Sequence, residues 1–87
     1  MRKHYKEILK AFFHSKVSQA RYDLEISQEE MAYRLAMACR NYVDLDNGKT
    51  CCSAVTLALF LIYICKDPVT FLEELRHAFE ADSDKAA

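Results

Sequence analysis

The apolar residues of this chain recur at steps of three and four along most of its length. Over residues 2–24 they form one such series: Tyr5, Ile8, Leu9, Phe12, Phe13, Val17, Ala20 and Leu24. Lysines at positions 3, 6, 10 and 16 occupy the opposite side. This repeat predicts one long amphipathic helix. A helix lying on a membrane surface would have the same pattern, but the rest of the chain supplies apolar partners, which favours packing in a core.

A second, shorter helix is predicted after a break near Ile26. Ser27 and Glu30 have the spacing of a capping box, in which each side chain accepts a hydrogen bond from the backbone N–H of the other residue. The residues expected to point inward from this helix are Met31, Ala32 and Leu35.

A third helix is predicted from Ala38 or Cys39 to about Asn47. Its inner side chains are expected to be Tyr42 and Leu45, and its outward ones Cys39, Arg40, Asn41, Val43 and Asp44. Gly48 follows directly and is expected to take the left-handed conformation that ends many helices.

A fourth helix is predicted over residues 54–65, AVTLALFLIYIC, with Ser53 as its N-cap. Twelve residues rise only about 18 Å, whereas the hydrocarbon core of a bilayer is about 30 Å thick. The segment is therefore not a membrane span. Because it is apolar on nearly every side, we expect either a central helix or a subunit interface.

A fifth helix is predicted to begin at Asp67-Pro68, a capping residue followed by proline at the first helical position. Its expected inner stripe is Val69, Leu72, Leu75 and Phe79, supported by Phe71 and Ala78. The polar tail over residues 83–87 is expected to be frayed.

The composition fits one all-α domain spanning residues 1–82. The chain has 87 residues, a single glycine and 52% hydrophobic residues, so β-hairpins have almost no turn signals. The net charge of -1 conceals a gradient, with +5 over residues 1–22 and -4 over residues 67–87. A basic end could face a polyanion, although exposed helix faces are often charged without any ligand.

The candidate chemistry for catalysis or metal binding is sparse. Cys39, Cys51, Cys52 and Cys65 lack paired zinc spacing, and the chain begins with no secretory signal, so free thiols in the cytoplasm are expected. The histidines, His4, His14 and His77, are scattered. No nucleophile and base, or pair of carboxylates, lies in an ordered motif. We expect no enzyme activity, no metal and no cofactor.

The middle of the chain resembles the Cro/repressor-type helix-turn-helix domains, also called the xenobiotic-response-element family. Arg21, the segment ISQEEMA from Ile26 to Ala32, Leu35, and the segment LDNGKT from Leu45 to Thr50 are similar to its pattern in order and spacing. The resemblance covers roughly residues 13–65, with the motif itself at 27–47. It implies a compact five-helix repressor-like domain, here with an extended N-terminal helix, that binds double-stranded DNA.

The resemblance also implies which residues contact DNA: Arg21, Gln28, Cys39, Arg40, Asn41, Asp44, Asn47 and Lys49. Gln28, at a helix start, would donate to a phosphate. Arg40 and Asn41 have the strongest chemistry for base edges, because arginine pairs with guanine and asparagine with adenine. Lys49 and the backbone at Asn47 would touch the sugar-phosphate chain.

The chain departs from the family pattern at three positions. Glu25 and Ala36 stand where the family often has glycine, and Ala38 stands where a serine or threonine usually caps the reading helix. Ala36 is expected to have ordinary backbone angles, and the missing cap at Ala38 costs about 1 kcal/mol.

Two functions follow from these observations. The first is a sequence-specific transcriptional regulator, binding two half-sites as a homodimer through the fourth or fifth helix. The second is a protein-interaction module on the same fold, suggested by Cys39, Val43, Asp44 and Asp46 on the reading helix. Arg40 could also pair with Asp44, four residues on, which would compete with base reading.

Overall fold

The protein is all-α, as predicted. The computed structural model describes the backbone of residues 2–86 and the side chains of residues 4–81, and no strand occurs in that part of the chain. The elements are α1 (Arg2–Leu24), α2 (Gln28–Arg34), α3 (Cys39–Asp46), α4 (Ala54–Leu59), a π-helical turn η1 (Phe60–Ile64) and α5 (Pro68–Ala86). No helix among the described residues is both long enough and apolar enough to cross a membrane.

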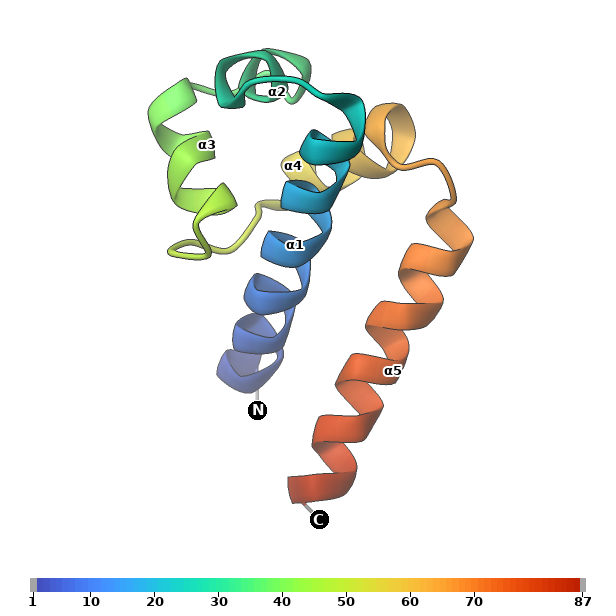
Figure 1. Ribbon diagram of the computed structural model, residues 1–87. Coiled ribbons are helices and arrows are strands. Elements are labelled where there is room, and N and C mark those ends of the chain that lie inside the picture. The colour runs from blue at the N-terminus through green and yellow to red at the C-terminus, as the bar shows by residue number, and fades with distance from the viewer. Residues whose placement is uncertain (1, 87) are drawn as a thin grey trace.

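The long helix α1 is the element around which the others are arranged (Figure 1). Helices α2 and α3 lie against each other on one side of it, while α5 runs along its other side. Phe13 of α1 packs edge-on against Phe60 and Phe71, with ring centroids 5.1 and 6.4 Å away. The buried core consists of Phe13, Val17, Met31, Ala32, Leu35, Tyr42, Leu45, Phe60, Phe71 and Leu75.

Three helices begin at the residues predicted to cap them. Ser27, Ser53 and Asp67 each accept a hydrogen bond from the backbone N–H three residues later, at 3.1 Å. Only half of the expected capping box is present, because the Glu30 carboxylate accepts from Arg34 Nε at 3.1 Å. The position of a cap is thus predictable from sequence, whereas the partner of a long side chain is not.

The predicted fourth helix is shorter than expected and buried on one side only. It is α-helical for six residues and then widens into the five-residue turn η1. Phe60 is 2% exposed, but Val55, Ile62 and Tyr63 are 69, 67 and 72% exposed. The expectation of a central helix is therefore wrong, and a band of large apolar side chains faces outward.

The predicted inner stripe of α5 is also partly wrong. Phe71 and Leu75 are buried, whereas Val69 and Leu72 are 66 and 50% exposed. Phe71 sets this rotation, because its ring packs against Phe12 at 5.1 Å. The backbone of α5 is helical to Ala86, and the side chains of residues 82–87 lie outside the described part, so fraying of residues 83–87 stays a prediction.

Three turns in the first half of the chain use the left-handed conformation. Glu25, Ala36 and Gly48 have φ values of 56, 54 and 76°. Each turn contains two backbone hydrogen bonds. The N–H of the left-handed residue donates to the carbonyl three residues earlier, and the N–H of the following residue donates to the carbonyl five residues before itself. This pair of hydrogen bonds is the Schellman motif that ends helices. Glu25 ends α1, Ala36 follows α2, and Gly48 follows α3.

The expectation of ordinary backbone angles at Ala36 is wrong. The chain must reverse between α2 and α3 so that Leu35 is buried, and the Schellman hydrogen bonds from Ala36 and Met37 achieve this reversal. The left-handed conformation costs an L-residue with a Cβ about 1–2 kcal/mol. The turn therefore carries strain that glycine would relieve.

We predict that Ala36→Gly raises the free energy of unfolding by about 1 kcal/mol, because glycine adopts positive φ without a steric penalty. Urea denaturation followed by circular dichroism measures this change. The matched control is Ala11→Gly, in the middle of α1, where the same substitution should lower stability by about 1 kcal/mol. Equal destabilisation by both substitutions would contradict the left-handed geometry at Ala36.

Candidate nucleic-acid interface

Helix α3 has one buried face and one outward face, as the sequence predicts. Tyr42, Leu45 and Asp46 are 0, 2 and 5% exposed. The outward side chains are exposed at Arg40 and Asn41 and half-buried at Cys39, Val43 and Asp44. Figure 1 shows α3 at the outer edge of the molecule, and the exposure of Arg40 and Asn41 leaves this face accessible to a partner.

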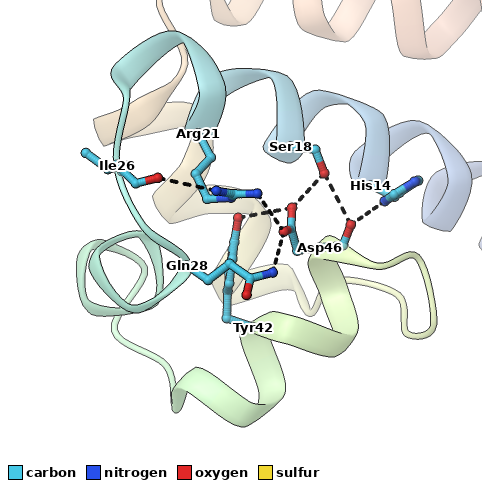
Figure 2. Close-up of polar contacts among 7 residues, drawn as sticks. All are labelled: His14, Ser18, Arg21, Ile26, Gln28, Tyr42 and Asp46. Atoms are coloured by element: carbon cyan, nitrogen blue, oxygen red, sulfur yellow. Dashed lines mark hydrogen bonds and ion pairs between the residues drawn. The ribbon is translucent and has the colours of Figure 1, made fainter.

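The buried face of α3 ends in a carboxylate that joins three helices (Figure 2). Asp46 Oδ1 accepts from Ser18 Oγ of α1 at 2.6 Å, and its Oδ2 accepts from Gln28 Nε2 of α2 at 2.8 Å. Arg21 of α1 completes an ion pair with Oδ2 at 3.3 Å, and the Tyr42 hydroxyl lies 3.4 Å from Oδ1. We call these five residues the Asp46 cluster.

A histidine holds the same end of α3 through its backbone. His14 Nδ1 lies 2.6 Å from the Asp46 carbonyl oxygen, and because a carbonyl can only accept, Nδ1 carries the proton. The imidazole also lies under Gly48, where a Cβ would be 3.2 Å from the ring carbon Cγ. Gly48 therefore serves two needs, the positive φ and the close approach of His14.

The environment of Asp46 favours its ionised form. Burial acts to raise its pKa, but the hydrogen bonds from Ser18 and Gln28 and the charge of Arg21 outweigh burial and lower the pKa below its usual range. The same surroundings raise the pKa of Tyr42, first through burial and then through the Asp46 charge. Asp46 is therefore an anion, and Tyr42 a neutral donor, at neutral pH.

Arg21 is turned inward, although the family resemblance counted it among the DNA contacts. Its side chain is 17% exposed, and besides pairing with Asp46 it donates from Nη1 to the Ile26 carbonyl at 3.3 Å. Its Nε is buried without a hydrogen-bond partner in the described structure. Arg21 thus connects the end of α1 to the loop before α2, and its charge is largely neutralised by Asp46.

Gln28 has one of its two amide hydrogens engaged by Asp46. It is half-buried at the first position of α2. The side chain is therefore held in one orientation, with its second N–H not occupied by any hydrogen bond within the described side chains. Gln28, the residue expected to meet a phosphate, is thus held in place by a hydrogen bond within the protein. The neighbouring Glu29 is exposed and adds a negative charge beside it.

The other predicted contact residues lie on α3 and the turn after it. Arg40 makes no ion pair among the described side chains, so the alternative pairing with Asp44 does not form. Asn47 and Lys49 are exposed on either side of Gly48. Ala38 starts α3 with no side-chain cap hydrogen bond, as expected from the sequence.

The role of Asp46 was missed because its charge suggested a surface position. Its spacing gave a usable signal, since residues 42, 45 and 46 fall on one helix face.

Among the described residues no group of three or more histidine, cysteine, aspartate or glutamate side chains could hold a metal ion. Comparison with family models, curated proteins and solved structures found no match to this chain.

We predict that Asp46→Asn lowers the free energy of unfolding by about 3 kcal/mol at pH 7, because it leaves the mostly buried Arg21 charge without its partner. The control is Asp44→Asn on the same helix, which should change stability by less than about 0.5 kcal/mol. Urea denaturation of the two variants and the parent protein measures both effects.

The same series tests the ionisation of Asp46. Because its pKa is lower in the folded than in the unfolded chain, its stabilisation is complete above about pH 4 and is lost as the pH falls below that value. The stability difference between the parent protein and Asp46→Asn should therefore shrink from pH 7 to pH 3. A difference that stays constant over this range would contradict an ionised Asp46.

Proposed function

We propose that this protein is a DNA-binding transcriptional regulator of the Cro/repressor helix-turn-helix type, acting in the cytoplasm. The observation that carries the proposal is the Asp46 cluster. It fixes α2 and α3 relative to α1 while Arg40 and Asn41 remain outward and unpaired within the described structure. A rigid pair of helices with free base-reading groups on the second is what groove recognition needs.

The three left-handed turns give independent support. Two of them, at Glu25 and Ala36, fall where the resembled family often has glycine, and the third is the glycine of the LDNGKT segment. Glu25 and Ala36 thus depart from the family in residue type while keeping the positive φ that glycine adopts without strain.

The alternative is a protein-interaction module on the same fold. Its support is the half-exposed trio Cys39, Val43 and Asp44 on the outward face of α3, which would not attract a polyanion. Asp46, one of the four residues that suggested this alternative, is buried and paired, which weakens it. The pairing of Lys10 with Glu7 and of Lys16 with Glu74 supports the interaction module, because these lysines are not free to bind phosphates.

The decisive experiment is selection of random-sequence duplexes, followed by titration of the enriched sequence. Arg40→Ala should weaken binding by about 1–3 kcal/mol and relax the preference at one base pair. Arg76→Ala is the control, because Arg76 is also exposed but lies on α5 and pairs with Glu80. Binding should also fall steeply with salt as counterions are released.

Three results would count against DNA recognition: no enriched sequence, binding insensitive to salt, or equal loss with Arg40→Ala and Arg76→Ala. If the selection fails while an affinity screen with Cys39 and Val43 variants identifies a protein that needs this face, the interaction module becomes the better account.

We further propose that the regulator works as a homodimer through the outward side of α4, η1 and α5. One reading helix covers only a few base pairs, and two half-sites about 34 Å apart would multiply the affinity. The support is the large exposed apolar side chains Val55, Ile62 and Tyr63, together with Val69 and Leu72.

Tyr63→Lys should therefore shift the protein toward monomer in light scattering coupled to size exclusion, because it places a charge in an apolar contact. Tyr33→Lys is the matched control, since Tyr33 is 80% exposed but lies on α2. A protein that is monomeric at all concentrations, or one dissociated equally by both variants, would contradict this interface.

A further inference from the structure

A cavity of about 230 Å³ lies away from the α2–α3 face. It is a partly open cleft lined by the C-terminal part of α1, the turn η1 and the beginning of α5. Its apolar lining is Ala20, Leu24, Phe60, Ile64, Cys65 and Phe71. None of these residues belongs to the Asp46 cluster, so the cavity is a separate feature of the fold.

The base of the cavity is aromatic. The rings of Phe60 and Phe71 are both nearly buried, 5.6 Å apart between centroids and inclined at 51°. Two inclined rings leave a surface on which a third flat ring can pack by edge or offset stacking. One wall is formed by the π-helical turn η1 through Phe60 and Ile64, and such turns occur frequently at functional sites.

The charges on the rim are nearly balanced. The three acidic side chains have partners: Glu74 with Lys16, Asp23 with Gln19, and Asp67 with Thr70. Asp67 also sits at the start of α5, where the helix dipole offsets negative charge. Lys66 adds one positive charge on the rim. A charged ligand would lose part of its water shell and would meet charges of its own sign as well as of the opposite sign on this rim, so the rim favours a neutral occupant.

The size of the cavity limits the ligand to one or two rings. A dry apolar cavity of about 150 Å³ binds benzene, and sites for drug-sized ligands begin at about 300 Å³. From this size, the aromatic base and the balanced rim, we propose that the cavity binds a small, uncharged, planar aromatic molecule. Such a ligand buries its ring against Phe60 and Phe71 and places any polar group at the rim.

Alkylation of the cysteines tests this proposal with an internal control. Cys65 lines the cavity, whereas Cys39 lies on α3, and both are partly exposed. We expect indole to slow the reaction of Cys65 with N-ethylmaleimide about fivefold at about four times its dissociation constant, leaving Cys39 unchanged. Peptide mass spectrometry reads both rates from the same sample. Indole-3-acetate and tryptamine, which carry a negative and a positive charge on the same ring system, should protect less.

Two variants define the location. Ala20→Leu should abolish protection, because the larger side chain fills the cavity. Lys66→Ala should leave protection by indole unchanged, because a neutral ligand does not use that charge. The three ligands on the unaltered protein decide the question even if Ala20→Leu fails to fold. Absence of Cys65 protection, equal slowing of Cys39, or tighter binding of either charged analogue would overturn the proposal.

Discussion

The rest of the structure depends on one buried carboxylate. Asp46 draws together Ser18 and Arg21 of α1 and Gln28 of α2, so a single anion fixes the relative positions of three helices. Burying a charge is unfavourable unless it is paired and hydrogen-bonded. This requirement makes the arrangement specific, because a shift of α2 or α3 away from α1 would leave the carboxylate or Arg21 unpartnered in the interior.

The cluster also separates the two sides of α3. The inward groups are occupied within the protein, so the outward residues, above all Arg40 and Asn41, are the ones left for a partner. The chain offers less free positive charge than its charge gradient suggests, because Arg21, Lys10 and Lys16 all pair with acidic side chains of the protein. Recognition of DNA would therefore depend on a few directed contacts more than on general attraction to phosphate.

The apolar side chains form a central core and two regions that are not fully packed within the protein. Phe13, Phe60 and Phe71 form the aromatic centre that holds α1, η1 and α5. The outward side of α4 and η1 leaves large apolar side chains exposed, and a cleft remains beside Phe60. Both features involve the segment after Ser53, which is apolar on nearly every side, whereas the fold buries only one side of it.

Local sequence signals determined which segments are helical and where three of the helices begin: three- and four-residue apolar spacing and the caps at Ser27, Ser53 and Asp67. Gly48 likewise marked the end of α3. These features depend on neighbours along the chain, which a sequence displays directly. Only the tertiary structure decided the rotation of α5 about Phe71, the π-helical turn at Phe60, the left-handed Ala36 and the inward roles of Arg21 and Asp46. Those outcomes depend on packing and on pairing across helices, where the gain from burying a ring or neutralising a charge outweighs local preference.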